Sequence, residues 1–353
     1  MRVVITGGAG FLGSLLARAI LERGELRDSR GNARPVRELV LVDVVAPARR
    51  DDPRVRAIQG SLDDRGVVAA AISPETDSIF HLAAVVSGQA EADFDIGMRV
   101  NVDATRNLLE RCRACAVPPK FVFASSLAVF GRTLPDPMSA AGPSQGANCA
   151  PSGGSAAATA ASVGVPVPDD APLTPQSSYG TQKAIGEFLV SDMSRKAFID
   201  GRSLRLPTIV VRPGKPNRAA SSFASGIIRE PLSGIAASCP VAPATRMWLQ
   251  SPRAVIGNLI IGHEARADQL ASARAINVPG ICVAVGDMVN ALRSVAGDGV
   301  ADLVRWEYDP VIDRIVSTWP ARFTADAGRA LGMRADDDFE SIVRAHVADT
   351  TSP

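Results

Sequence analysis

The stretch Val3-Val4-Ile5-Thr6-Gly7-Gly8-Ala9-Gly10-Phe11-Leu12-Gly13 decides the fold of this chain. A short β-branched run passes directly into a glycine loop, and an apolar-periodic helix follows at once. Glycines let the backbone approach a pyrophosphate, and a helix N-terminus supplies oriented N–H groups and a positive dipole. A tight turn between strand and helix is the alternative, but the strand and helix around the loop favour a dinucleotide site. We therefore predict that Gly7, Gly10, Phe11, Leu12 and Gly13 contact such a cofactor.

Beyond this loop, short apolar runs alternate with longer amphipathic stretches through the first 215 residues. This alternation is typical of βαβ units, and near-continuous apolar strands suit a sheet covered on both faces. The expected strands are residues 3–6, 39–43, 55–58, 78–82, 121–125 and 204–211, and the expected helices are residues 12–23, 64–71, 100–112 and 179–194. The sequence thus predicts an α/β fold, a Rossmann-like doubly wound parallel sheet.

The domain organisation follows from where this pattern loosens. Residues 1–213 form the expected dinucleotide-binding domain, and residues 214–353 mainly form a smaller C-terminal substrate-binding lobe, with some segments returning to the main sheet. Residues 25–37 are a polar insertion. Residues 138–166 are almost wholly Ala, Ser, Gly and Pro, so we expect a flexible surface loop there, with a lid over the site as the alternative.

Composition excludes several classes of protein. The 38 basic and 37 acidic residues nearly cancel, so no nucleic-acid partner is expected. No apolar run approaches the roughly 20 residues of a membrane helix, and the N-terminus leaves no room for a signal peptide, so we expect no membrane contact and a cytoplasmic location. Cys112-x-x-Cys115 would be a redox or half-zinc motif, but no second pair follows, so structural thiols and no metal are expected.

Acidic and polar residues follow the second and third expected strands. Asp43 ends the second strand, where a carboxylate would bind the adenosine ribose hydroxyls and repel a 2′-phosphate, which favours NAD over NADP. Ser61 and Leu62 follow the third strand, at a place suited to the adenine edge. A solvated strand end for Asp43 and a helix cap for Asp63 are the alternatives.

The catalytic signature is Ser178-Tyr179-Gly180-Thr181-Gln182-Lys183. Positions four apart share one face of a helix, so the Tyr179 phenol and the Lys183 ammonium would both face the cofactor. A nearby cation favours the phenolate, which makes Tyr179 usable as a general base. Tyr-x-x-x-Lys alone is a frequent surface pair, but together with the glycine loop it points to catalysis.

With these motifs the chain resembles an extended short-chain dehydrogenase/reductase, the NAD-dependent group that includes nucleotide-sugar epimerases and dehydratases. The resemblance covers almost the full length. Further segments carry it: His81-Leu82-Ala83-Ala84, Asn101 to Asn107, Phe123 to Gly131, and Leu206-Pro207-Thr208.

The resemblance implies roles for these positions. Ser126 would be the catalytic hydroxyl beside Tyr179, with Ser125 as its substitute. The implied cofactor contacts are Ala83, Ala84, Asn101, Ser125, Pro207, Tyr179 and Lys183. His81 is expected to be structural. The family also implies a homodimer or higher homo-oligomer.

Two departures from the nucleotide-sugar members concern the substrate. Phe130 stands where many of them have tyrosine, and residues 214–226 do not resemble their usual lobe. That segment, with residues 248–253, instead resembles the D-erythronate dehydrogenase branch of the superfamily. This implies oxidation of a small sugar acid at C2, with Ser87, Ser126, Asn217, Ser222 and Arg253 as expected substrate contacts. A nucleotide-sugar epimerase or dehydratase is the near alternative, and a non-catalytic NAD-responsive binding protein is the remote one.

Overall fold

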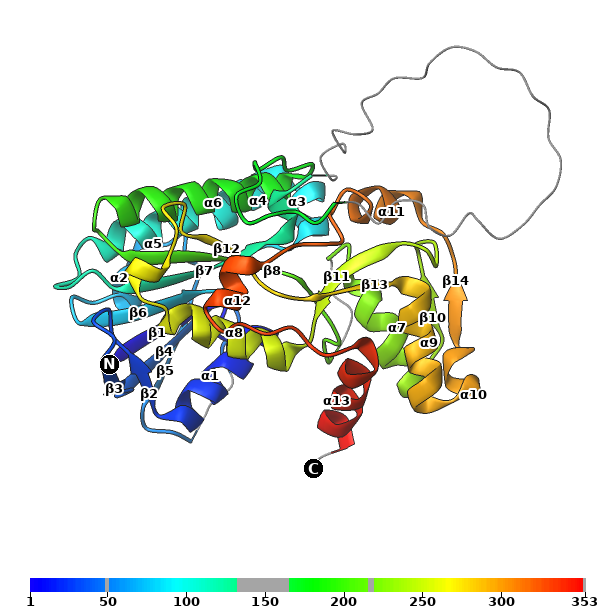
Figure 1. Cartoon of the computed structure of the whole chain (residues 1–353). Helices are drawn as coiled ribbons and strands as arrows, with labels where there is room; N and C mark the ends of the chain where they lie inside the picture. The colour runs from blue at the N-terminus through cyan, green and yellow to red at the C-terminus, as the bar shows by residue number, and fades with distance from the viewer. Residues whose placement is uncertain (48–50, 132–164, 215–218, 352–353) are drawn as a thin grey trace, which may run out of the picture.

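The computed structural model describes residues 1–47, 51–131, 165–214 and 219–351. Its centre is a seven-stranded sheet in the order β12-β8-β7-β6-β1-β4-β5, in which every neighbouring pair is parallel (Figure 1). The strands are β1 (Arg2–Thr6), β4 (Glu38–Asp43), β5 (Val55–Gln59), β6 (Thr76–His81), β7 (Lys120–Ser126), β8 (Asp200–Leu206) and β12 (Ala275–Asn277). The predicted doubly wound parallel sheet is confirmed.

Alternation along each strand divides the core between the two faces of this sheet. In β1, Val3 and Ile5 pack into one apolar cluster and Val4 packs into another. Helices α1 (Phe11–Arg23) and α8 (Pro252–Glu264) cover the first face, whereas α2 (Arg65–Ala71), α5 (Ala104–Cys112) and α6 (Ser178–Arg195) cover the second. A strand buried on both sides must be apolar at successive positions, which explains the unbroken runs in the sequence.

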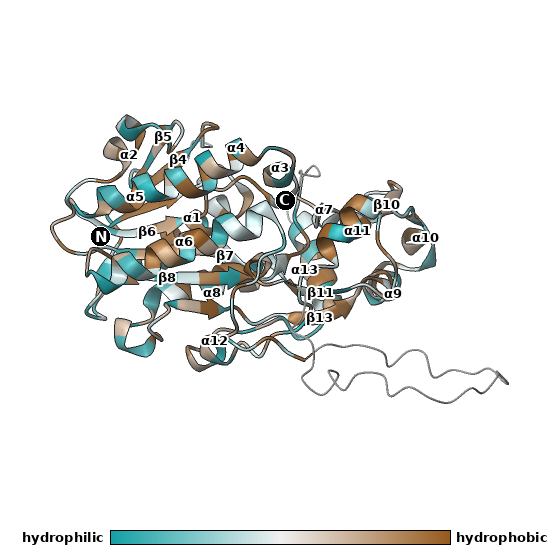
Figure 2. Cartoon of the chain, turned by 90° about the horizontal axis from the view of Figure 1, so that it is seen from above, coloured by the Kyte–Doolittle hydropathy of each residue, from teal (hydrophilic) through white to brown (hydrophobic). Residues whose placement is uncertain are grey.

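The second lobe has its own core, and Figure 2 shows it beside the sheet. Helices α7 (Ser222–Leu232), α9 (Val285–Ala296) and α13 (Phe339–Thr351) contribute Ile227, Leu292 and Ile342 to it. Two small sheets complete the lobe, the first of β9 (Thr208–Ile209), β11 (Arg246–Gln250) and β13 (Ile281–Ala284), the second of β10 (Ala237–Cys239) and β14 (Val304–Trp306). Short helices α10 (Asp298–Ala301) and α11 (Pro310–Val316) flank it, and α12 (Asp326–Ala330) lies against β12. Because α8 and β12 belong to the main sheet layers, chain beyond residue 213 serves both halves.

Several element boundaries differ from those expected. The polar segment at residues 25–37 forms a hairpin of β2 (Glu25–Arg27) and β3 (Ala33–Pro35), with Leu26 fully buried. The strand expected at residues 204–211 begins at Asp200 as β8 and breaks before β9. Asp200 and Arg202 form a buried ion pair at 3.0 Å. Their polar side chains do not fit the apolar pattern expected of a central strand, so the sequence did not indicate where this strand begins.

Of the helix expected at residues 100–112, residues 104–112 form α5, whereas residues 100–103 belong to a π-helical segment, Met98–Asp103, that follows α3 (Ser87–Ala92) and α4 (Phe94–Gly97). Such π-helical turns are rare and cluster at functional sites. This one places Arg99 and Val100 in the cavity described below.

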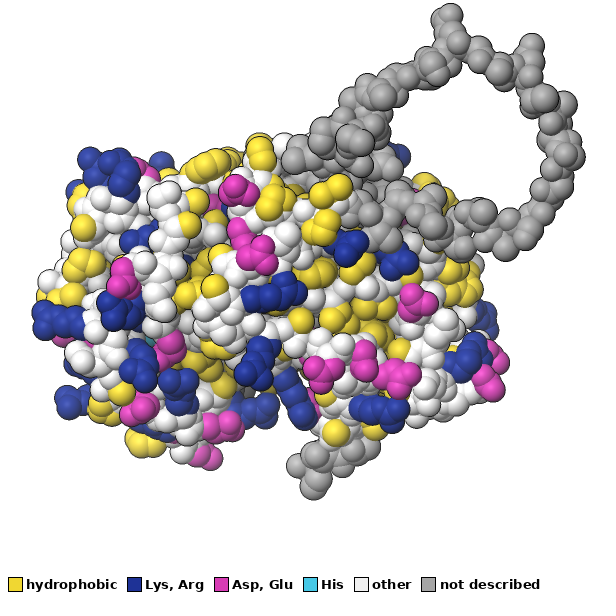
Figure 3. Space-filling model, viewed as in Figure 1, with side chains coloured by type: hydrophobic (Ala, Val, Ile, Leu, Met, Phe, Trp, Pro, Cys, Tyr) yellow, Lys and Arg dark blue, Asp and Glu magenta, His cyan; other side chains and the backbone are white. Residues whose placement is uncertain are grey.

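The expected flexible loop at residues 138–166 lies outside the described residues except for Val165 and Pro166, and Asn217 lies outside them too. No helix among the described residues is long and apolar enough to cross a membrane. On the face shown in Figure 3, basic and acidic side chains are interspersed, which is consistent with the near-zero net charge.

Candidate active site

One cavity of about 730 Å³ opens at the carboxyl ends of the central strands. In a doubly wound sheet this is where ligands bind, because the loops that follow the strands diverge there. The cavity is lined by most of the residues expected from the sequence: Gly7, Gly10, Phe11, Leu12, Gly13, Asp43, Ser61, Leu62, Ala83, Ala84, Ser87, Ser125, Ser126, Tyr179, Lys183 and Pro207. The motifs that lie far apart in the chain therefore meet in one place.

The glycine loop leaves the start of α1 open to a ligand. Gly10 precedes the helix and makes no side-chain cap bond, so the first N–H groups of α1 keep their donor capacity. Gly7 has a φ of +72°, and a Cβ there would meet the Ala83 nitrogen at 2.9 Å. A Cβ at Gly13 would lie 2.1 Å from the Gly7 carbonyl oxygen. Only glycine permits this close approach of loop, helix and neighbouring strand.

Asp43 lies beside this loop at the end of β4. Its carboxylate accepts hydrogen bonds from the Ala9 backbone N–H at 3.0 Å and from the Val45 N–H at 3.2 Å. These bonds fix a negative charge at the edge of the cavity. Asp63, also in the cavity, pairs with Arg99 at 3.5 Å, and the cap of α2 is the next residue, Asp64.

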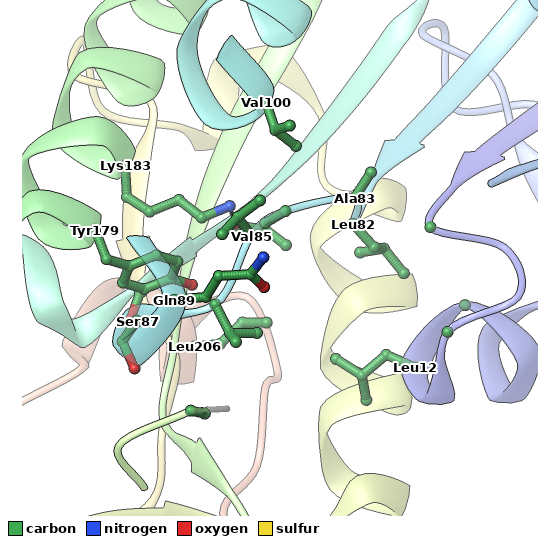
Figure 4. Close-up of a pocket in the computed structure, with 18 of the residues that line it drawn as sticks. Leu12, Leu82, Ala83, Val85, Ser87, Gln89, Val100, Tyr179, Lys183 and Leu206 are labelled. Atoms are coloured by element: carbon green, nitrogen blue, oxygen red, sulfur yellow. Dashed lines mark hydrogen bonds between the residues drawn. The ribbon is translucent and has the colours of Figure 1, made fainter. Parts of the chain in front are cut away.

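Tyr179 and Lys183 project from one face of α6 into the cavity, and Figure 4 shows them side by side. Ser177 starts the helix, because its side chain accepts a bond from the Gly180 N–H at 3.1 Å. Gly180 is required there, since a Cβ would lie 2.1 Å from the Ala128 oxygen. The Ser126 hydroxyl lies near enough to the Tyr179 phenol to lower its pKa by hydrogen bonding, and both side chains line the cavity.

Burial dominates the electrostatics of this pair. It lowers the pKa of Lys183 to about 7, against the opposing charge of Glu187, and the ammonium donates to the Ala124 carbonyl at 2.8 Å. Burial also raises the pKa of the Tyr179 phenol, which the Arg212 guanidinium and the bond with Ser126 partly offset. The phenol thus faces a cation that the sequence did not identify.

The Ser125 hydroxyl is bound to a buried carboxylate, whereas the Ser126 hydroxyl lies beside the Tyr179 phenol. The Ser125 hydroxyl donates to the Glu187 carboxylate at 2.5 Å, and the Arg205 guanidinium donates hydrogen bonds of 2.8 to 3.1 Å to the same carboxylate. Arg205 also bonds Asn277 and lies over the Phe130 ring. This buried group orients β7, β8 and α6 relative to one another.

Asn101 and His81 support the cavity without lining it. The Asn101 amide bonds both backbone groups of Val85 and donates to Gln182 at 2.8 Å, so it ties the loop after β6 to α6. His81 bonds Thr6 and Thr105 at 2.7 and 2.8 Å, and burial lowers its pKa to about 3. His81 is therefore a neutral imidazole that is hydrogen-bonded at both ring nitrogens, and its role here is in packing.

The expected substrate residues are scattered. Ser87 lines the cavity and accepts a bond from the Ala220 N–H at 3.2 Å. Ser222 instead lines a neighbouring apolar cavity of about 690 Å³. Arg253 lies outside the active-site cavity, where its exposed guanidinium pairs with Asp349 on α13. The structure therefore does not bring Arg253 to the reacting atoms.

Several cavity residues escaped the sequence analysis, and Gln89, Arg99 and Arg212 are the ones with large polar side chains. Figure 4 shows Gln89 near the Tyr179 ring. Arg212 follows β9 in Val210-Val211-Arg212-Pro213, and the only signal was a charged residue at the end of an apolar run.

The thiols of the Cys112-x-x-Cys115 pair are bound to backbone oxygens. Cys112 donates to the Leu108 carbonyl and Cys115 to that of Ser73, and burial raises the pKa of both thiols. Neither is therefore an activated thiolate. Within the described ranges, no group of three or more His, Cys, Asp or Glu side chains is arranged to hold a metal.

Comparison with known proteins agrees with this geometry. The chain is 52% identical over 349 residues to D-erythronate dehydrogenase from Cupriavidus necator, covering 99% of this chain and 98% of that protein. It is 41% identical to D-erythronate dehydrogenase from Haemophilus influenzae, with 98% of each covered. Among solved structures, a nucleoside-diphosphate-sugar epimerase from Agrobacterium tumefaciens superposes with a TM-score of 0.84 at 38% identity, covering 99% of this chain and 94% of that one.

The family model that matches describes the NAD dependent epimerase/dehydratase family, and it spans residues 3–248. That span holds the glycine loop, Asp43, Ser126, Tyr179 and Lys183, which all line the cavity. The chain belongs to the NAD dependent epimerase/dehydratase family.

Proposed function

We propose that this protein oxidises D-erythronate with NAD, taking hydride from C2 and releasing the 2-keto acid and NADH. The observation that carries the proposal is the convergence of Tyr179 and Ser126 in a cavity whose far end is the open start of α1. Full-length identity of 52% and 41% to two D-erythronate dehydrogenases supports the substrate.

The cavity suits an NAD molecule along its whole length. The uncapped N-terminus of α1 and Gly7 would hold the pyrophosphate. Asp43 would bind the adenosine ribose, and its fixed charge would repel a 2′-phosphate. Lys183 would bind the nicotinamide ribose, while Ala83 and Ala84 leave the groove unobstructed. When bound, NAD supplies the acceptor for the hydride.

Proton removal is the task of the protein's own residues. Ser126 and Tyr179 would hold the C2 hydroxyl between them, and the phenolate oxygen of Tyr179 would take its proton as the C2–H bond breaks. The remaining electron pair of the O–H bond forms the new carbonyl. Arg212 favours the phenolate by lowering the pKa of the Tyr179 phenol, and a charged Lys183, whose Nζ lies 5.7 Å from the centre of the ring, would add to this effect.

A nucleotide-sugar epimerase is the second candidate, and the similarity to the Agrobacterium protein supports it. Both activities would use Tyr179 and Ser126, but they differ in where the hydride ends. An epimerase returns it to the sugar, so no net NADH forms, whereas a dehydrogenase accumulates NADH.

The test supplies excess NAD with D-erythronate in one cuvette and with a UDP-hexose in another, and follows NADH absorbance. We expect NADH from D-erythronate alone. Turnover of the UDP-hexose without NADH, together with inertness toward four- to six-carbon sugar acids, would replace the proposal with the epimerase.

A homodimer or larger homo-oligomer also stays a prediction from the family resemblance, and a cytoplasmic location stays a prediction from the apolar pattern of the sequence. Light scattering coupled to gel filtration measures the first, and fractionation of the source cells measures the second.

A further inference from the structure

The chemistry of the proposed substrate sets a geometric requirement on the site. In a 2-hydroxy acid the carboxylate carbon is bonded directly to C2, so the anionic oxygens lie two bonds from C2 and three bonds from the oxygen of the reacting hydroxyl. A cation that binds them must therefore lie beside Tyr179 and Ser126. Inside a cavity with few waters, such an ion pair needs a donor of matching geometry, and guanidinium provides two parallel N–H groups.

Three cationic side chains line the active-site cavity within the described ranges: Arg99, Lys183 and Arg212. Arg99 pairs with Asp63, and Asp63 lies at the adenine end of the cavity beside Ser61 and Leu62. Lys183 donates to the Ala124 carbonyl from behind the Tyr179 ring and is expected on the nicotinamide ribose. Arg212 remains, at the end of the cavity that the second lobe forms.

Arg212 is close enough to Tyr179 for their charges to interact directly. The guanidinium lowers the pKa of the Tyr179 phenol, and the phenolate in turn favours the protonated guanidinium. Burial has the opposite effect and lowers the pKa of Arg212. Keeping the buried guanidinium charged therefore costs the folded protein free energy. Among the described residues, no carboxylate contributes to stabilising that charge.

The structure also fixes where this cation stands. The Arg212 Nε donates to the Ile209 carbonyl at 3.2 Å. Its backbone N–H donates to the Ser225 hydroxyl at 3.0 Å, and its carbonyl accepts from the Arg229 guanidinium at 2.6 Å. Ser225 and Arg229 both lie on α7, so this helix of the second lobe holds Arg212 at the end of the cavity where Tyr179 lies. A pre-positioned cation loses little side-chain entropy when it binds an anion.

We propose that Arg212 binds the carboxylate of the sugar acid and so selects 2-hydroxy acids over neutral sugars and polyols. This rests on the proposed function. The carboxylate supplies the counter-charge that the described residues do not give Arg212, and its capture turns the C2 hydroxyl toward Tyr179 and Ser126.

The experiment compares Arg212→Gln with the parent protein on two substrates, D-erythronate and D-erythronamide, which is its neutral analogue of nearly equal shape. We expect kcat/KM for D-erythronate to fall by roughly 100-fold or more, because a buried charge pair loses one partner. kcat/KM for the amide should fall by a smaller factor, about 10-fold or less, because the amide loses only the stabilisation that Arg212 gives the Tyr179 phenolate. Arg212→Lys should keep part of the preference, and added guanidinium ion should restore part of the activity of Arg212→Gln toward the acid.

Arg253→Gln is the matched control. It removes the same guanidinium from an exposed ion pair with Asp349 outside the cavity, so kcat/KM for D-erythronate should stay unchanged. The dissociation constant of NAD and the melting temperature of each variant show that the fold and the cofactor site are intact.

Equal losses on acid and amide in Arg212→Gln would overturn the assignment, as would full activity on the acid. A parent protein that oxidises no sugar acid would instead remove the proposed function, and the inference with it. The two failures are distinguishable, because only the second is visible before any substitution is made.

Discussion

Two buried clusters that meet at α6 differ in how their charges are balanced. In the first cluster, Glu187 faces Arg205 at 2.8 Å and also accepts from Ser125. Its charges are paired within the protein, and we call it the closed cluster. In the second cluster, Lys183 and Arg212 are held near Tyr179 by hydrogen bonds to backbone carbonyls, and we call it the open cluster. The paired charges of the closed cluster orient secondary structure, whereas the charges of the open cluster would be able to bind a ligand. Charge pairing therefore distinguishes the two clusters, although both are buried.

The largest expected effect concerns the open cluster. Tyr179→Phe removes the one oxygen that titrates at the reacting hydroxyl, so kcat should fall roughly 1000-fold. The dissociation constant of NAD, measured by titration, should stay close to the parent value. A phenylalanine variant with full turnover would assign the base to another group.

The closed cluster should respond in stability. Glu187→Gln leaves the Arg205 charge buried without its counter-ion, so the free energy of unfolding should drop by about 3–5 kcal/mol. Urea denaturation measures this. Arg212→Gln is the matched case from the open cluster, and it should cost far less, since no described carboxylate loses its partner. Similar losses in both variants would erase the distinction between the clusters.

Lys183 should carry a stability cost that depends on pH. The unfolded chain keeps the ammonium proton up to its ordinary pKa of 10.5, but burial lowers the folded pKa to about 7. Folding thus releases a proton between these values, and this contribution makes the free energy of unfolding rise with pH across the window.

Lys183→Met removes that cost. Without NAD, the variant should be more stable than the parent by roughly 2 kcal/mol near pH 7, and the advantage should shrink toward pH 10.5. Denaturation of both proteins across this range measures the difference. An advantage that does not vary with pH would mean that Lys183 is not the titrating group.

The smallest expected effect concerns cofactor choice. Asp43→Asn keeps an acceptor for the Ala9 N–H but removes the charge, so the preference for NAD over NADP should fall about 10-fold or more. Dissociation constants for both cofactors give the ratio. Asp63→Asn is the control within the same cavity, and it should leave the ratio unchanged.

The contrast also shows what the sequence can predict. The glycine loop and the Tyr179–Lys183 spacing are local patterns, so strand, turn and helix geometry place them without knowledge of the rest of the chain. Buried charges are harder. Arg202 lies fully buried in β8 and Arg212 faces Tyr179, because segments distant in sequence surround them.

Arg253 illustrates the same limit. The resemblance of residues 248–253 to the D-erythronate dehydrogenase branch implied a substrate contact for Arg253, but α13 brings Asp349, 96 residues away, against it. Pairing with a distant residue cannot be read from a local pattern. The partner of a cation therefore depended on the fold, whereas the place of Tyr179 in the cavity did not.

The fate of the C2 hydrogen tests the central claim most directly. With [2-²H]-D-erythronate and NAD, mass spectrometry should find one deuterium in the reduced cofactor and a 2-keto acid without deuterium. With [3-²H]-D-erythronate the reduced cofactor should carry none. Deuterium that stays in the acid, or that reaches the cofactor from C3, would contradict oxidation at C2 by this site.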